Sequence, residues 1–285
     1  MKDIEIRKMT EADLPEAMAL KEVEGWNQTE DDWRFYLEHN PEHCLVASRG
    51  GQVLGTVTAA NYCSRVAWIG MMLVNRSARR QGISSCLMRE VIESLKDCDS
   101  IKLDATPAGR QVYRSLGFLD EFEIVRMGSQ NTPPGLPESL KAGVISRIQE
   151  SDISEIFALD SQAIGVDRPE LIRYLLSNHP GENLCVRRDG KIYGFALLRK
   201  GTRFNHVGPV VCRHSEDALA MILELRKIRE GAMIVDLLAD KTFLHEKLLE
   251  AGFIIQRSFT RMYLERNPRP GEPVILQAIT GPELG

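Results

Sequence analysis

The sequence lacks several patterns that commonly identify a function. No apolar run approaches the ~18 residues of a membrane-spanning helix, and the opening MKDIEIRKMT lacks the apolar core of a signal peptide. The six cysteines form no C-x-x-C pair, and the six histidines are dispersed along the chain. We therefore expect no membrane partner, no disulfide framework and no metal, and we place the chain, with reduced thiols, in the cytoplasm.

An excess of positive charge is also missing. The net charge is −4 at pH 7, whereas nucleic-acid binding usually requires a basic surface, so no nucleic-acid partner is expected. Hydrophobic residues make up 43% of the chain and charged residues 27%, as in ordinary globular proteins. The 285 residues are enough for one large domain or two of common size.

The most informative segment reads as a strand, a basic turn and a helix. Trp68–Val74 is an apolar run of strand length, and Asn75–Gln81 interrupts it with three arginines. Gly82 then opens a helix through Leu95, whose apolar positions are Ile83, Leu87, Met88, Val91, Ile92 and Leu95. Such a helix directs its free N–H groups and positive dipole end toward a ligand above the sheet, which suits a phosphate or pyrophosphate.

The turn carries no Gly-x-Gly-x-x-Gly and no Gly-Lys-Ser/Thr motif. Instead, Arg79-Arg80-Gln81-Gly82-Ile83-Ser84 resembles the acyl-CoA pyrophosphate loop of the GNAT acetyltransferase superfamily, Gln/Arg-x-x-Gly-x-Gly/Ala. Ser84 is a mild departure in the last small position. The resemblance implies acetyl-CoA as the co-substrate, with the strand amides at Met72, Leu73 and Val74 holding its pantetheine and polarising the carbonyl.

A second element follows the predicted strand Ser100–Ala105. Thr106 is a good N-cap, and Pro107 and Gly117 suit the two ends of a short helix. Ala108, Val112 and Leu116 are predicted to face the sheet, and the ring of Tyr113 to lie over Gly109. GNAT enzymes commonly place a tyrosine four residues before a Gly-Phe pair, so the resemblance implies that Tyr113 protonates the departing CoA thiolate. Thr106 stands where the family often has a cofactor-binding asparagine.

The order of predicted elements up to residue 130, βααβββαβαβ, is also that of the GNAT fold. The loop between the first two helices borders the acceptor site in this fold. Trp26 and Asn27 lie in that loop, so the resemblance makes them candidate substrate contacts, although a tryptophan there can instead fill the core.

The second half of the chain repeats the first. EADLPEAMAL at 11–20 matches ESDISEIFAL at 150–159, and GGQVLG at 50–55 matches DGKIYG at 189–194, both at an offset of 139 residues. Where the first copy has VNRSARRQGIS, the second has VCRHSEDALAM, in which Glu216 and Asp217 bring the wrong charge for a pyrophosphate. Leu248 replaces the tyrosine before the second Gly-Phe pair.

We therefore predict an α/β protein with mixed sheets and two tandem GNAT folds. Residues 1–130 form the acetyl-CoA-binding catalytic domain, 131–141 a linker, 142–268 a degenerate GNAT-like domain and 269–285 a proline- and glycine-rich tail whose role the sequence does not reveal.

The expected reaction is direct transfer of an acetyl group from acetyl-CoA to the amine of a small molecule. Because an amine with a pKa of about 10 is mostly protonated at neutral pH, it must first lose a proton. The central strand offers Gly70, Met71 and Met72 but no carboxylate, so the base is a water relay, a distant residue such as Glu24, or unnecessary for an amine of low pKa. A peptide or protein amine, a longer acyl group and a non-catalytic acyl-CoA sensor are the alternatives, and a homodimer is compatible with all of them.

Overall fold

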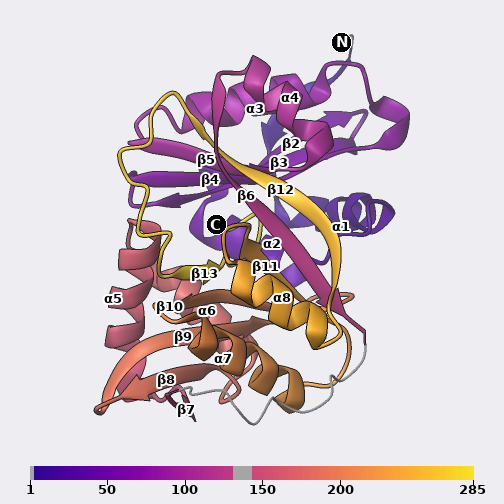
Figure 1. The fold of residues 1–285 in the computed structure, drawn as a ribbon. Helices are drawn as coiled ribbons and strands as arrows, with labels where there is room; N and C mark the ends of the chain where they lie inside the picture. The colour runs from indigo at the N-terminus through magenta and orange to yellow at the C-terminus, as the bar shows by residue number, and fades with distance from the viewer. Residues whose placement is uncertain (1–2, 131–142) are drawn as a thin grey trace.

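The computed structural model describes residues 3–130 and 143–285, so the predicted linker at 131–141 lies outside the described residues. Two halves follow one another with the same order of elements, as the sequence repeat predicts (Figure 1). The elements coincide at the offset of 139 residues: α1 begins at Leu14 and α5 at Ile153. The prediction of a mixed α/β fold in two similar halves is confirmed.

The bounds of the elements are as follows. The first half contains β1 Glu5–Lys8, α1 Leu14–Val23, α2 Glu30–His39, β2 Leu45–Arg49, β3 Gln52–Tyr62, β4 Val66–Val74, α3 Ile83–Ser94, β5 Ser100–Ala105, α4 Pro107–Ser115 and β6 Phe118–Ser129. The second contains β7 Val144–Arg147, α5 Ile153–Ile164, α6 Pro169–Asn178, β8 Leu184–Arg188, β9 Lys191–Arg199, β10 Asn205–Cys212, α7 Ser215–Ile228, β11 Met233–Leu238, α8 Thr242–Glu250, β12 Ile254–Leu264 and β13 Leu276–Ala278.

One sheet runs through both halves because they exchange their last long strands. Its order is β1-β2-β3-β4-β5-β12-β6-β11-β13-β10-β9-β8-β7. Strand β12 of the second half lies antiparallel between β5 and β6 of the first, and β6 in turn pairs with β11 of the second. Figure 1 shows β6 and β12 crossing together from one half to the other. Each half therefore completes its sheet with a strand from the other.

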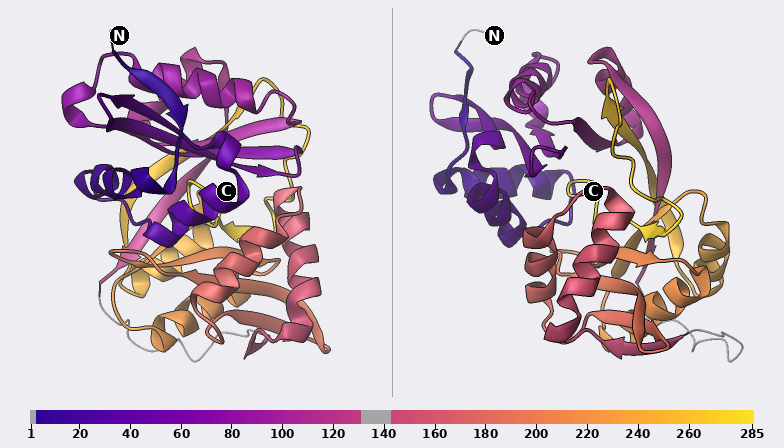
Figure 2. Two further views of the ribbon diagram at one scale, coloured as in Figure 1. Left: turned by 180° about the vertical axis from the view of Figure 1, so that it is seen from behind. Right: turned by 90° about the vertical axis from the view of Figure 1, so that its left-hand side faces the viewer.

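Helices cover the sheet in three groups. One continuous apolar core joins α1 and α2 to α5 and α6, with Trp33 and Ile172 fully buried and the rings of Phe35 and Tyr174 stacked 4.8 Å apart. The outer face of the first half packs on α3, and that of the second on α7 and α8. Figure 2 shows the α1, α2, α5 and α6 helices between the two halves. The inner core thus seals the halves together.

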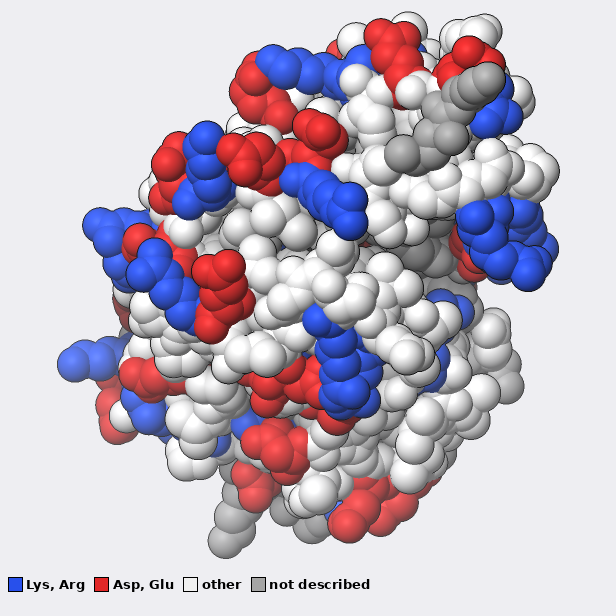
Figure 3. Space-filling model, turned by 90° about the horizontal axis from the view of Figure 1, so that it is seen from above, with Lys and Arg blue, Asp and Glu red and all other residues white. Residues whose placement is uncertain are grey.

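The surface above the first half carries charges of both signs. Acidic and basic side chains are intermixed over this face rather than gathered by sign (Figure 3). The described part of the chain contains no helix long and apolar enough to cross a bilayer.

The tail after β12 crosses back into the middle of the molecule. Strand β13 pairs with both β10 and β11, and Gln277 secures it by donating to the carbonyl of Cys212 at 2.8 Å. The next residues lie beneath the first half, where Tyr62 donates to the carbonyl of Leu284 at 2.8 Å and Arg168 donates to the same carbonyl at 3.1 Å. From Ile275 onward the tail is therefore largely buried and contacts both halves.

Candidate active site

The central strand β4 separates from β5 halfway along its length. Their parallel pairing ends at Ile69 and Leu103. Directly beyond, β4 has a bulge opposite β3, where Met71 adopts a φ of 49° and its carbonyl accepts from the Thr56 hydroxyl at 2.7 Å. A bulge bends its strand and leaves backbone groups unpaired. The result is a wedge-shaped opening between β4 and β5 that can take an extended ligand.

The helix after this strand begins with unpaired N–H groups. Gly82 is the N-cap of α3 with a φ of 80°, and no side chain caps the helix there. The first N–H groups of an α-helix have no partner within the helix and carry its positive dipole end. The amides of Ile83 and Ser84 are thus available to an anion such as a pyrophosphate.

The side chains of the basic turn differ in their freedom. Arg79 donates to Glu24 at 2.6 Å, and Gln81 accepts from Arg49 at 3.2 Å. Arg80 is exposed, with a φ of 61°, and no hydrogen bond or ion pair engages it within residues 3–130 and 143–285. Arg80 is therefore available to a phosphate, whereas Glu24, considered above as a base, is bound to the turn and does not line the pocket described below.

Tyr113 lies at the opposite edge of the opening, on α4. Thr106 caps this helix by accepting from the Gly109 N–H at 3.3 Å, as its sequence predicts. A Cβ atom on Gly109 would lie 3.0 Å from Cε2 of Tyr113, so the ring covers this glycine in the predicted way. Burial raises the pKa of Tyr113 to about 12. The phenol therefore stays protonated at neutral pH and can donate a proton.

The predicted sheet-facing side of α4 is wrong at Ala108 and Val112 and right at Leu116. Ala108 and Val112 are exposed, the latter by 40%, and the inward side is formed by Gly109, Tyr113 and Leu116. The helix is rotated so that its large aromatic ring, rather than its aliphatic residues, covers the sheet.

A pocket that is partly open to solvent lies between the two halves beside the bulge. It brings together five of the predicted site residues, namely Trp26, Asn27, Met72, Thr106 and Tyr113. The others, Leu73, Val74, Arg79, Arg80, Gln81, Gly82, Ile83 and Ser84, lie along the end of β4 and the start of α3, outside its lining. The pocket and the helix end are thus two parts of one path along β4.

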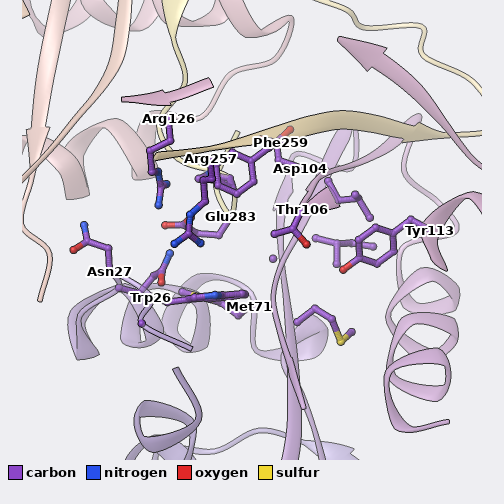
Figure 4. A pocket seen from close by; sticks show the side chains of 17 residues that line it. Trp26, Asn27, Met71, Asp104, Thr106, Tyr113, Arg126, Arg257, Phe259 and Glu283 are labelled. Atoms are coloured by element: carbon purple, nitrogen blue, oxygen red, sulfur yellow. The ribbon is translucent and has the colours of Figure 1, made fainter. Parts of the chain in front are cut away.

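Asn27 has a structural task at the pocket wall. Its side-chain amide donates to the carbonyl of Phe204 at 3.0 Å and accepts from the N–H groups of Arg203 and Phe204 at 3.1 and 2.9 Å. These bonds attach a loop of the second half to the first. Trp26 remains half-buried, and Figure 4 shows its ring lying across the pocket floor.

The tail contributes a carboxylate to this pocket, that of Glu283, which no sequence motif indicates. The tail packs so closely on the central strand that a Cβ on Gly70 would lie 2.7 Å from Cβ of Glu283. Burial opposes ionisation of Glu283, but Arg199, whose Nη2 is 2.5 Å from Oε1, holds its pKa below the usual value. The tail thus places an ionised carboxylate against the strand that has none of its own.

Two other ion pairs support the pocket. Arg261 on β12 donates two hydrogen bonds to Asp104 on β5, at 2.9 and 3.0 Å. Arg126 on β6 donates two hydrogen bonds to Asp236 on β11, each at 2.7 Å. Each pair joins strands from different halves. The exchanged strands therefore form the pocket wall, which no motif in the sequence indicates.

The corresponding opening in the second half is occupied by the chain itself. Parallel pairing of β10 with β11 ends at Val207 and Val235, and β13 enters directly beyond, opposite Val210 and Leu237. The helix that follows, α7, carries Glu216 and Asp217 in its first turn. Within residues 3–130 and 143–285, no group of three or more His, Cys, Asp or Glu could hold a metal ion.

Comparisons with known proteins agree with these observations. The model of the Acetyltransferase (GNAT) family matches residues 6–118, and that of an Acetyltransferase (GNAT) domain matches residues 156–273. Among curated proteins, the uncharacterized N-acetyltransferase YitH of Bacillus subtilis is 26% identical over 77% of this chain and 74% of its own. Holothin acyltransferase of a Pseudoalteromonas species is 23% identical over 92% of this chain and 88% of its own.

The fold is also similar to that of solved structures. A putative acetyltransferase from Pyrococcus horikoshii has a TM-score of 0.84 and 22% identity, covering 100% of this chain and 97% of that one. The GNAT fold implies binding of acyl-CoA, and the opening beside β4 with the free helix end at Gly82 fits such a ligand. The chain belongs to the GNAT superfamily, as an acetyltransferase with two GNAT domains in tandem.

Proposed function

We propose that this enzyme transfers the acetyl group of acetyl-CoA directly to the amine of a small molecule, in the first half only. The observation that carries the proposal is the contrast between the two openings. The opening between β4 and β5 is free beyond Ile69, whereas β13 fills its counterpart between β10 and β11. We assign the catalytic unit to residues 1–130 completed by β12, and the degenerate domain to 142–268.

The donor would lie along β4 with its pyrophosphate at the start of α3. The amides of Ile83 and Ser84, with Arg80, would bind the pyrophosphate, and the β4 amides from Met72 to Val74 would bind the pantetheine. Thr106 and Tyr113 face the thioester end of this path. A negative charge at Gly82 should therefore oppose the donor directly.

The acceptor would enter from the side of Trp26 and Glu283. Its nitrogen attacks the thioester carbon, and the C–S bond breaks as the amide C–N bond forms. We infer that the Glu283 carboxylate receives the proton from nitrogen while Tyr113 gives a proton to the sulfur. Within the described pocket, the buried Oε1 of Gln28 has no hydrogen-bond partner and can accept from the amine.

A small acceptor is favoured because the second half covers this end of the pocket. The loop fixed by Asn27 and the tail at Pro282 and Glu283 both close the approach. One relative that matches over 92% of this chain is named holothin acyltransferase. A peptide amine would need a longer open groove.

Titration calorimetry of acetyl-CoA into the wild type and Gly82→Asp tests the proposal. We expect one site per chain, lost in Gly82→Asp because a side chain and a negative charge occupy the pyrophosphate position. His214→Asp is the matched control, since it places the same charge at the N-cap of α7 in the second half. Two sites per chain, or loss of binding in the control, would contradict the assignment to the first half.

Turnover with an amine panel then separates an enzyme that uses small acceptors from the alternatives. Acetylation of peptides but not of small amines would favour a peptide acceptor. Binding of acetyl-CoA without transfer to any amine would favour a sensor and contradict the proposed reaction.

A further inference from the structure

We propose that the acceptor is a small amine that also carries a carboxylate, bound by the guanidinium of Arg257. The inference rests on the proposed function and adds the acceptor class to it. Three features of the pocket carry it: an unpaired cation on one wall, acceptors for an ammonium group on another, and aromatic side chains in its lining.

Arg257 is the unpaired cation. The other arginines in and around the pocket have acidic partners: Arg126 has Asp236, Arg261 has Asp104 and Arg199 has Glu283. Arg257 lines the same pocket, yet none of the described residues forms a hydrogen bond or ion pair with it. A guanidinium without a protein partner is well suited to bind a carboxylate through two parallel hydrogen bonds.

The position of Arg257 is fixed by the sheet. It lies on β12 directly opposite Arg126 of β6, within a long antiparallel pairing rather than on a loop. The side chain of Arg257 is exposed at the pocket wall, and partial burial together with the neighbouring Arg126 lowers its pKa, an effect that the Asp236 carboxylate, which is paired with Arg126, offsets only in part. An anion bound at this point would relieve that repulsion. The residues of the basic turn do not line this pocket, so Arg257 is not part of the pyrophosphate site.

Acceptors for an ammonium group lie on the wall formed by the α1–α2 loop and the tail. Gln28 is 7% exposed with its Oε1 unpartnered, and Glu283 is an ionised carboxylate against Gly70. Figure 4 shows Glu283, Arg126 and Arg257 at one end of the pocket and Tyr113 at the other. An amine held by Gln28 and Glu283 would therefore lie between the reacting carbonyl and Arg257.

Two aromatic side chains also line the pocket. Trp26 and Phe259 line the pocket, and the ring centroid of Phe259 lies 5.1 Å from Cζ of Arg126. A pocket with a fixed cation, fixed acceptors and aromatic walls matches an amino acid with an apolar side chain better than it matches a diamine or a sugar.

The experiment compares matched acceptors in wild type and Arg257→Met. L-phenylalanine and L-leucine are each assayed beside their α-amides, which keep the amine but lose the carboxylate. Arg257→Met should lower kcat/KM for the amino acids by about 10- to 100-fold, the value of a charge-assisted hydrogen bond, and leave the amides unchanged. Comparing the variant's effect within each pair cancels the different reactivity of the amines.

Two controls locate the effect. Arg89→Met, at an exposed arginine of α3, should change no acceptor, and Arg257→Lys should restore part of the preference for amino acids. The affinity for acetyl-CoA should be the same in all variants.

Other results would overturn the inference. Equal losses for acids and amides would give Arg257 a structural role, and weaker acetyl-CoA binding would assign it to the donor. If the wild type and Arg257→Met both acetylate the amides at the same rate as the amino acids, the inference is contradicted. The proposed transferase function is then unaffected. Failure to bind acetyl-CoA, or to acetylate any amine, would instead contradict the proposed function and this inference with it.

Discussion

The ion pair between Arg261 and Asp104 allows the strand exchange to be measured in solution. The two residues are 157 positions apart in the chain and belong to β12 and β5. Their side chains are 4% and 0% exposed, and two bonds of 2.9 and 3.0 Å join them. Such proximity exists only if β12 leaves its own half and completes the first.

Arg261→Met should destabilise the protein by about 3–5 kcal/mol, because it leaves the Asp104 carboxylate buried without its partner. Methionine keeps part of the contact that the guanidinium makes with the Trp68 ring, 4.2 Å from its centroid. Burial already raises the pKa of Asp104, so in the variant its folded-state pKa lies well above the unfolded value. The loss of stability should therefore be smallest in acid and grow as the pH rises through that folded-state pKa.

Removing both partners should cost less than the sum of the single changes. Asp104→Leu leaves an unpaired buried arginine, whereas Asp104→Leu with Arg261→Met replaces the pair by apolar groups, which is often neutral. Urea unfolding of the four proteins gives the coupling energy. The stability losses caused by mutations at independent sites add within about 0.3–0.5 kcal/mol. Additive losses of stability at Arg261 and Asp104 would therefore refute the strand exchange. Arg257→Met combined with Asp104→Leu is the control, and this combination should be additive.

Two further predictions concern the pocket. Tyr113→Phe should lower kcat by about 10²–10⁴-fold with unchanged acetyl-CoA affinity by calorimetry. Because the pKa of Tyr113 is raised to about 12, its protonated form persists through pH 10, and an alkaline limb near pH 9 that disappears in the variant would contradict the raised pKa. An unchanged kcat in Tyr113→Phe would contradict its role as acid. Gly70→Ala places a methyl group 2.7 Å from Cβ of Glu283, so it should displace the tail, lower the melting temperature and reduce kcat. Full activity in Gly70→Ala, measured at saturating acetyl-CoA, would show that Glu283 takes no part in the reaction.

Local patterns predicted individual elements well. The strand Ser100–Ala105 has the predicted bounds, and Thr106 caps the helix that follows as predicted. Their signals lie within a few residues of each element, in caps, in breakers and in apolar runs. The helix start at Gly82 was readable for the same reason.

Long-range pairing was not predictable in the same way. The repeat makes β6 and β12 equivalent. This equivalence does not determine whether each strand pairs with β5 of the first half or with its counterpart in the second half, β11. Glu283 lies more than two hundred residues from Gly70, within a tail whose composition resembles a linker. On α4, periodicity alone favoured Ala108 and Val112 as the inner face, because it ignored the space that the ring of Tyr113 fills above Gly109.

The exchanged strand also determines when the enzyme can finish folding during synthesis. The first half has all its own elements once β6 has emerged, but β5 and β6 remain without the strand that joins them until β12 follows. At the usual ~5–20 residues per second, translation takes about 7–27 s to proceed from Ser129 to Leu264. During this interval the nascent chain exposes two open β edges, which are templates for aggregation. We therefore expect nascent chains that stop between β6 and β12 to be the species on which chaperones act.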